Sequence, residues 1–254
     1  MKLEYQNYKH LGWGPIAAVL GTILVFFAGQ VLAGTFIIAV LLVMGWDMSR
    51  IQDWLGGDGT SQFVLIAVVE VITLALLYLF LRSRNAHPKD IGLIRPRLRD
   101  VGYTFLGIGI YIALYISIVA VLTKLFSSLD TSQAQELGFN TDSTGTGLLL
   151  VFVGLVILPP ITEEIIARGF LYSGLRTSIK FLPAAIITSL LFGVAHLAGG
   201  EGGSTIWIAF VDTFILSMVL VYLRERSGSL WAPIGLHGAK NLIAFLALFV
   251  FKIA

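Results

Sequence analysis

The stretch PPITEEIIAR, residues 159–168, places three ionisable side chains inside an apolar run that begins near residue 147. Charged residues at membrane depth are costly, so they usually face the interior of a helix bundle or a water-filled cavity. On a helix, Glu164 and Arg168 are i, i+4 neighbours with the acid first, which is the favourable order for an ion pair. Glu163 points in another direction and has no local partner. The pattern predicts one carboxylate held by Arg168 and a second that is available for chemistry.

The composition of the 254-residue chain is that of a membrane protein. Hydrophobic residues make up 57% of it and charged residues 13%, whereas a soluble domain carries roughly 25% charged residues. The net charge of +2 gives no reason to expect a nucleic-acid partner. The chain contains no cysteine, which excludes disulfides, thiolate metal sites and a cysteine nucleophile. We therefore expect an all-α, polytopic membrane protein whose main partner is the lipid bilayer.

Seven segments are candidates for membrane-spanning helices, which need about 20 mainly apolar residues, and the fifth of them is short. They are, approximately, residues 13–45, 61–81, 101–123, 146–171, 183–198, 205–223 and 231–251. The first is too long for a signal-peptide core and is interpreted as a retained helix. Pro159-Pro160 interrupts the fourth, which predicts a kink or a break there. An eighth span is expected if the first or the fourth segment splits.

The positions of lysine and arginine indicate the orientation, because cytoplasmic loops carry more of them. With the N-terminus in the cytoplasm, the inside segments contain 12 of these residues and the outside segments 3. We expect an integral protein of a bacterial or archaeal plasma membrane with a cytoplasmic N-terminus. Residues 1–124 are expected to be framing helices and residues 146–245 the catalytic core of one membrane domain. No internal repeat is present, which argues against the common inverted-repeat transporters.

Two later segments add polar groups to those of residues 159–168. Phe192 precedes His196 by one helical turn, and Asn241 follows His237 by one turn. A carboxylate removed from water, such as Glu163, suits a general base, and a neutral imidazole can hold and polarise the same water. An imidazole with an amide offers hydrogen-bond donors to a developing oxyanion. These groups fit attack of an activated water on an amide carbonyl, and the alternative is that two histidines and a glutamate hold zinc.

The order of these residues resembles that in a known family. Three motifs carry the resemblance: Glu163-Glu164-x-x-x-Arg168, Phe192-x-x-x-His196 and His237-x-x-x-Asn241. They are similar to the signature of the CAAX protease and bacteriocin-processing family, the ABI group that includes type II CAAX prenyl endopeptidases. The stretch RERSGSLWAPI, residues 224–234, is also similar to that family. The resemblance covers about residues 146–245 and implies an ABI-like helical bundle with a cavity open to the cytoplasm.

The resemblance also implies a role for each motif residue. Glu163 and His196 would activate the water, and His237 and Asn241 would stabilise the oxyanion. Supporting positions would be Glu164, Arg168 and Phe192. The family has been described both as metalloproteases and as metal-free glutamate-dependent proteases. Because no HExxH motif is present, we prefer a mechanism without a cofactor, with zinc on Glu163, His196 and His237 as the alternative.

The expected activity is hydrolysis of a peptide bond near the cytoplasmic membrane face. The substrate would be a prenylated protein that loses its C-terminal tripeptide, or a peptide such as a bacteriocin that is matured. The alternative is a non-catalytic immunity or scaffold protein that binds a membrane partner. Glu70 and Asp212 also fall within predicted spans, and each is expected to find a polar partner, with Asp212 closer to the site. Lys240 is expected to face another side of its helix than Asn241, and either to snorkel or to pair with an acid.

Overall fold

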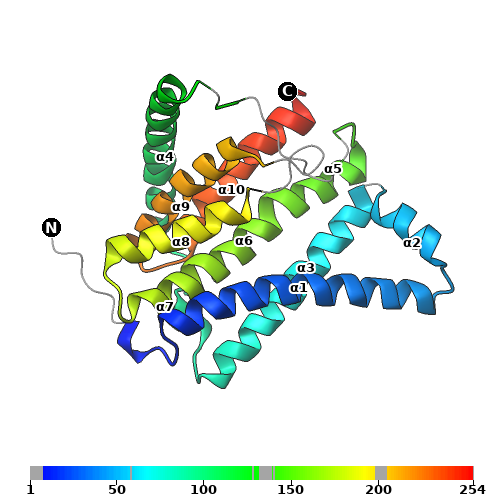
Figure 1. Ribbon diagram of the computed structural model, residues 1–254, viewed down its shortest axis with the longest axis horizontal. Helices are drawn as coiled ribbons and strands as arrows, with labels where there is room; N and C mark the ends of the chain where they lie inside the picture. Colours follow the sequence, from blue (N-terminus) through cyan, green and yellow to red (C-terminus); the bar gives the residue numbers. More distant parts are fainter. Residues whose placement is uncertain are drawn as a thin grey trace.

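The computed structural model describes residues 8–57, 59–127, 129–131, 139, 141–197 and 205–253, and these residues form an all-helical structure (Figure 1). The first half contains η1 (Tyr8–His10), α1 (Pro15–Val43), α2 (Met48–Leu55), α3 (Gly59–Ser83), η2 (Pro88–Ile91) and α4 (Leu98–Leu125). The second half begins with α5 (Gly145–Phe152), η3 (Val153–Ile157), α6 (Leu158–Glu164), η4 (Ile165–Leu171) and α7 (Tyr172–Arg176). It ends with α8 (Phe181–Ala195), α9 (Trp207–Ser227), α10 (Trp231–Phe245) and η6 (Leu246–Val250).

Six helices among the described residues are long and apolar enough to cross a membrane, so the protein is a polytopic helical membrane protein. They are α1, α3, α4, the composite helix from α5 to α7, α9, and α10 extended by η6. The predicted fifth segment forms α8, which has 15 residues and is shorter than the about 20 that a span requires. Each of the seven predicted segments is therefore helical. Neither the first nor the fourth is split into two spans over the residues described.

The composite helix is continuous from Gly145 to Arg176, so of the kink or break predicted at Pro159-Pro160 the break does not occur. Proline lacks an N–H group, and its ring clashes with the carbonyl four residues earlier. The helix accommodates the two prolines by widening into the π-helical section η3 just before them. The N–H of Leu158 accordingly donates to the carbonyl of Val153, five residues back. The prolines change the hydrogen-bond register of the helix and do not end it.

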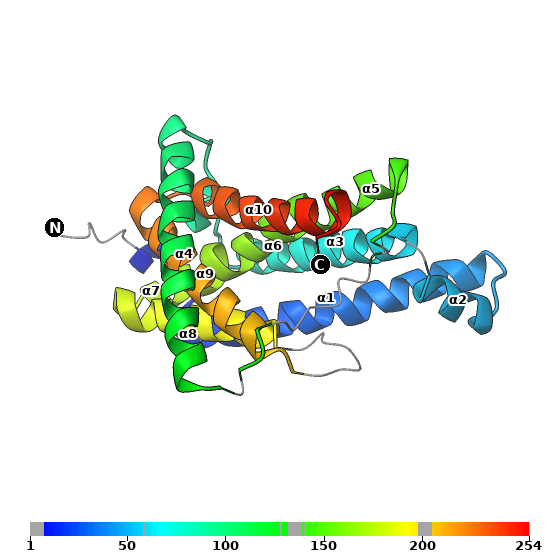
Figure 2. The same ribbon diagram turned by 90° about the horizontal axis from the view of Figure 1, so that it is seen from above.

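The composite helix passes through the middle of the bundle (Figure 1). On one side α1 packs against α3, and on the other α8 packs against α9. Helix α4 lies across the direction of most other long helices in both views, and it packs against α9 and α10 (Figures 1 and 2). The bundle therefore has two distinct ends along its long axis. We call them the α7 end, with α7 and the connection from α9 to α10, and the α5 end, with the start of α5 and the end of η6 (Figure 1).

Aromatic packing holds the N-terminal helix to the composite helix at the α7 end. The Trp13 indole N–H donates to the carbonyl of Phe170 at 3.2 Å, and the two rings stack with centroids 5.4 Å apart. Phe80 of α3 packs edge-on against the same Phe170 ring at 5.0 Å. Phe170 is fully buried as a result. These contacts join α1, α3 and η4 into one closely packed layer.

The contact between α1 and α3 depends on Gly29. A Cβ atom at Gly29 would overlap the hydroxyl of Thr73, whereas a Cβ at Gly34 on the same helix meets no atom within 4 Å. We expect Gly29→Ala to lower the stability of the protein by about 1–3 kcal/mol through overpacking. Gly34→Ala should be neutral or stabilising, because alanine is the better helix former. Thermal unfolding of both variants in detergent checks this, and equal midpoints would contradict the proposed close contact.

Candidate active site

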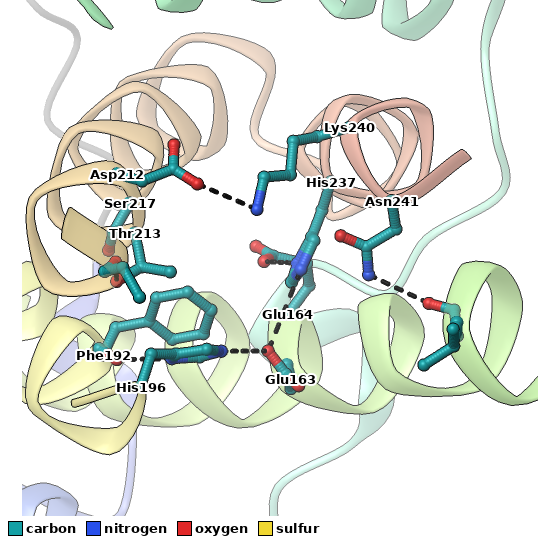
Figure 3. A network of polar contacts seen from close by, with 12 residues as sticks. Glu163, Glu164, Phe192, His196, Asp212, Thr213, Ser217, His237, Lys240 and Asn241 are labelled. Carbon is teal, nitrogen blue, oxygen red and sulfur yellow. Dashed lines mark hydrogen bonds and ion pairs between the residues drawn. The ribbon is translucent and has the colours of Figure 1, made fainter. Parts of the chain in front are cut away.

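Four side chains singled out from the sequence line one cavity of about 900 Å³ (Figure 3). Glu163 comes from α6, His196 is the residue that follows α8, and His237 and Asn241 come from α10. The volume lies at the upper end of the range for ligand pockets. Three segments far apart in the sequence thus bring their polar groups to one place inside the bundle.

Glu163 lies between the two histidines. Its Oε2 atom is 3.9 Å from His196 Nε2 and 3.9 Å from His237 Nε2. This oxygen is buried and has no hydrogen-bond partner among the described residues, while the side chain as a whole is 32% exposed. A separation of 3.9 Å is too long for a direct hydrogen bond. It is a distance that one bridging water can span.

The neighbours of the two imidazoles determine which ring nitrogen carries the proton. His196 Nδ1 lies 2.8 Å from the carbonyl of Phe192, and a carbonyl only accepts, so Nδ1 must donate. His237 Nδ1 lies 2.9 Å from Glu164 Oε1, and this carboxylate also accepts. In the neutral rings both Nε2 atoms therefore carry lone pairs. When the Glu163 carboxyl group is a carboxylate, three acceptors face one another, and this arrangement is favourable only when a proton donor or a cation lies among them.

A buried ion pair stands behind His237. Arg168 Nη1 donates to Glu164 Oε1 at 2.7 Å, and both side chains are fully buried. Arg168 Nη2 donates to the hydroxyl of Ser217 on α9 at 2.6 Å. The pairing of Glu164 with Arg168 agrees with the sequence-based expectation. The same Glu164 oxygen accepts from the imidazole and the guanidinium, so it couples the ring orientation of His237 to the ion pair.

Phe192 separates the ion pair from the cavity. The guanidinium carbon of Arg168 lies 4.4 Å from the centre of the Phe192 ring, a cation–π contact. The other contacts of that ring are with His196, at 4.8 Å between centroids, and with His237, at 5.9 Å. Phe192 therefore packs against both imidazoles and helps to fix their positions. The side chain supports the site and brings no reactive group to it.

Asn241 compensates for the two prolines of the composite helix. The carbonyl of Leu155 would bond to residue 159 in an α-helix or to residue 160 in a π-helix, and both are prolines without an N–H group. Asn241 Nδ2 donates to this carbonyl at 2.9 Å instead. The contact positions α10 against the composite helix one turn away from His237. This contact uses one of the two amide hydrogens of Asn241 and does not use the second.

A further charged pair lies on the cavity wall and was not assigned to the site from the sequence. Lys240 Nζ is 3.0 Å from Asp212 Oδ2, and the Tyr111 hydroxyl on α4 also donates to Asp212. Lys240 pairs with an acid as expected, but it lines the same cavity as Asn241. The sequence contained a signal for this pair. Asp212 is the single Asp, Glu, Lys or Arg residue of its predicted span, and Lys240 is the single one of its own. Two opposite charges at membrane depth favour pairing.

Glu70 of α3 also finds a polar partner. Its carboxyl group hydrogen-bonds to the Thr162 hydroxyl and lies close enough to Glu163 for electrostatic interaction. Thr162, which precedes Glu163 in the sequence, is buried. Helix α3 therefore contributes Glu70, which lies outside the three motifs, to the surroundings of Glu163.

The cavity extends toward the α5 end of the bundle. Thr131, Phe139 and Thr141 line it there, together with Phe249 of η6. Close in sequence to two of these residues, Lys252 Nζ donates to Asp142 at 2.7 Å, and this bond keeps the pKa of Asp142 below its usual value.

The donor types in the cavity suit zinc, since two imidazoles have Nε2 lone pairs and Nδ1 atoms held by acceptors. Ligands around one tetrahedral zinc lie about 3.3 Å from one another, and Glu163 Oε2 is 3.9 Å from each Nε2. Over the residues that the structure describes, no three His, Cys, Asp or Glu side chains are grouped so that they could hold a metal ion. The observed arrangement therefore does not form a zinc site without a shift of these side chains.

Comparison with known families agrees with the motifs. Residues 145–243 match the family model described as type II CAAX prenyl endopeptidase Rce1-like. The matched range includes every residue of the three motifs, and it confirms the resemblance predicted from them. Comparison with curated proteins and with solved structures gives no match.

Removal of the Arg168 charge tests the ion pair. Arg168→Met leaves the fully buried Glu164 without its guanidinium, which costs about 3–5 kcal/mol for a buried pair. We expect little folded protein in the membrane. The double variant Glu164→Gln with Arg168→Met should restore the amount of folded protein in the membrane, because it leaves no unpaired buried charge. Quantification of folded protein by size-exclusion chromatography in detergent checks both, and wild-type yield of the single variant would contradict the pairing.

The contact between Asn241 and Leu155 predicts a coupling to Pro159. Asn241→Leu removes the donor to a partly buried carbonyl and should cost about 1–2 kcal/mol. Pro159→Ala restores a backbone N–H for the same carbonyl. In the Pro159→Ala background, Asn241→Leu should therefore cost less. Thermal unfolding of the four proteins in detergent measures the coupling, and equal losses in both backgrounds would show that Asn241 does not compensate for the proline.

Proposed function

Because the chain carries a domain of the Rce1-like family over residues 145–243, we propose that this membrane protease hydrolyses a peptide bond with water activated by Glu163. The observation that carries the proposal is the position of Glu163 Oε2, unpaired among the described residues and 3.9 Å from two imidazole Nε2 atoms. A water molecule donates two hydrogen bonds and accepts two. It can donate to Glu163 and to one imidazole Nε2, while the second imidazole is left to interact with the substrate carbonyl.

In the first step, Glu163 accepts one proton of the water while the water oxygen bonds to the substrate carbonyl carbon. His196, with Nδ1 held by the Phe192 carbonyl, accepts the second O–H hydrogen bond through Nε2 and orients the oxygen lone pair. His196 can take this role because its Nε2 carries a lone pair when Nδ1 donates to the Phe192 carbonyl. An orienting contact and a positioned base reduce the entropy cost of the attack and remove the proton as the C–O bond forms.

The carbonyl oxygen becomes an oxyanion and needs hydrogen-bond donors. His237 can donate from Nε2 only as the imidazolium, and the Glu164 carboxylate at its Nδ1 stabilises that charge. The second amide hydrogen of Asn241 supplies another donor. When the tetrahedral intermediate collapses, the C–N bond breaks and Glu163 returns its proton to the leaving amine. Each proton taken from the water is thereby accounted for, and no cofactor enters the scheme.

The substrate belongs to one of two classes that this chemistry serves. One is a prenylated protein from which the C-terminal tripeptide is removed, and the other is a peptide precursor that is matured at the membrane. The apolar wall of the cavity, with Leu155, Leu216 and Phe245, suits aliphatic or aromatic side chains in either substrate. The second candidate function, a scaffold that binds a membrane partner, uses the same pocket without the reaction.

Replacement of Glu163 separates the enzyme from the scaffold. Glu163→Gln keeps the size of the side chain but removes the base, so we expect cleavage to fall by about 10²–10⁴-fold with an unchanged melting temperature. The control is Asp53→Asn, which changes an exposed acid on α2 and should leave cleavage intact. The assay uses protein in detergent with a fluorogenic farnesylated CAAX peptide and a set of leader peptides. Equal activity of wild type and Glu163→Gln would favour the scaffold.

A chelator distinguishes the two mechanisms discussed for the family. Cleavage by the wild type should survive prolonged dialysis against a strong chelator, because the proposed base is a carboxylate and not a metal-bound water. The control is a zinc protease treated in parallel. Loss of cleavage that zinc restores would move the assignment to a metalloprotease on Glu163, His196 and His237.

A further inference from the structure

A cavity separate from the candidate active site lies at the α7 end of the bundle (Figure 1). Its volume is about 400 Å³, and none of its lining residues lines the cavity that contains Glu163. The wall is formed by η1, by η2 with the following Gly92, and by the last turn of α9 with the following Gly228. Three segments that are far apart in the sequence therefore meet around this cavity.

Arg224 of α9 brings a buried positive charge to this cavity. The residue is 1% exposed, and its Nε and Nη1 atoms have no hydrogen-bond partner among the residues that the structure describes. The ring of Tyr8, 5.9 Å from the guanidinium carbon, offers a cation–π contact. Arginine keeps its charge inside proteins, and a buried charge without hydrogen-bonded partners is costly. The guanidinium therefore calls for an anion that the described side chains do not supply.

Two acidic side chains lie near Arg224, and both are engaged by other groups. Glu225, the next residue in the sequence, accepts a hydrogen bond from Arg176 Nη2 at 2.6 Å. Asp90, which lines the cavity, accepts from the backbone N–H of His87 at 2.8 Å. Over the described part of the chain, neither carboxylate bonds to the Nε or Nη1 atom of Arg224. These donors are therefore left for a ligand.

The backbone around Arg224 holds the guanidinium at the cavity. Gly92 has a φ of 88°, and a Cβ atom there would lie 2.5 Å from Cζ and 2.6 Å from Nη2 of Arg224. A larger residue would therefore displace the guanidinium. The carbonyl of Gly92 accepts from the N–H of Leu230 at 2.9 Å, and the N–H of Gly228 donates to the carbonyl of Arg224 at 3.0 Å. These bonds fix the loop and the helix end to each other, so the site is formed without a ligand.

The other charges near the cavity also favour an anion. Lys89 lies on the wall with its side chain exposed. Arg97 and Arg99 both donate to the carbonyl of Ser227, directly before the part of the wall that follows α9. Asp90 is the one acidic residue among the described lining residues. Positive groups thus outnumber the acid, and their combined field attracts a negatively charged ligand.

We propose that this cavity binds a phosphate group through Arg224 and Lys89. A guanidinium presents its N–H groups in a planar fork that matches phosphate oxygens, and lysine binds phosphate as a point charge. The phosphate belongs to the head group of an anionic phospholipid or to a soluble phosphate compound. Basic pockets between membrane helices bind such head groups. The ligand would join η1, η2 and α9, and this binding does not depend on the proposed hydrolysis.

Thermal unfolding of the full-length protein in lipid-free detergent tests the site. The probes are inorganic phosphate and dihexanoyl phosphatidylglycerol, each titrated at an ionic strength held constant with potassium chloride. Dihexanoyl phosphatidylcholine, which has the same tails and no net charge, is the matched lipid control. Because a ligand that binds only the folded state stabilises it, we expect one of the two probes to raise the melting temperature of the wild type. A rise with inorganic phosphate assigns a soluble phosphate, and a rise with phosphatidylglycerol alone assigns a lipid head group.

Variants then show whether the effect comes from this cavity. Arg224→Met removes the guanidinium and keeps an unbranched side chain, so the apparent affinity for the effective probe should fall by about 10–100-fold. Lys124→Gln removes one exposed positive charge in the last turn of α4 and should respond as the wild type does. No rise with either probe, or the same rise with both lipids and none with phosphate, would overturn the proposal. An equal response of Arg224→Met and wild type would overturn it as well.

Lys89→Gln keeps the proposal testable if Arg224→Met does not fold. Lys89 is exposed on the cavity wall, so its replacement should leave the melting temperature without probe unchanged. We expect its apparent affinity for the effective probe to fall by about tenfold, because one charged contact to the phosphate is lost. A wild-type affinity of Lys89→Gln, or an equal loss in Lys124→Gln, would show that no phosphate is bound at this cavity.

Discussion

A guanidinium that is completely removed from water needs an anion, and the organisation of this bundle follows from that requirement at Arg168. The nearest carboxylate is one turn away at Glu164, and both groups are fully buried. The pair recruits Ser217 from α9, Phe192 from α8 and His237 from α10. Four helices are thus joined by one charged pair. An unpaired charge in this position would be strongly destabilising, so the pair restricts how these helices can pack.

The reactive part of the site is a consequence of the same pair. Glu164 holds His237 by Nδ1 and thereby leaves Nε2 directed at Glu163. The Phe192 carbonyl does the same for His196. Glu163 itself has none of these supports, and its oxygen is left to face two lone pairs. Two adjacent glutamates therefore have different environments. One is neutralised within the protein, and the other is available to a water and a substrate.

The composite helix combines a structural difficulty with its solution. Two prolines leave the Leu155 carbonyl without a backbone donor in either helical register, and Asn241 supplies one. The sequence did not specify this contact: it indicated an oxyanion role for Asn241 and predicted a kink or a break at the prolines. The ion pair of Glu164 with Arg168 was foreseen, because spacing on one helix determines that contact. Contacts between helices, such as Lys240 with Asp212, depend on packing and had only a charge signal.

By itself, the sequence determined the properties that depend on composition and on spacing within one segment. These include the helical membrane class, the segments that become helices, the buried ion pair and the motifs that indicate the family. The convergence of Glu163, His196 and His237 on one cavity was decided only by the tertiary structure. These residues come from three separate segments, and the sequence placed each of them only along its own segment. Packing between helices brings them together, and a one-dimensional pattern of apolar residues contains no information about where facing side chains meet.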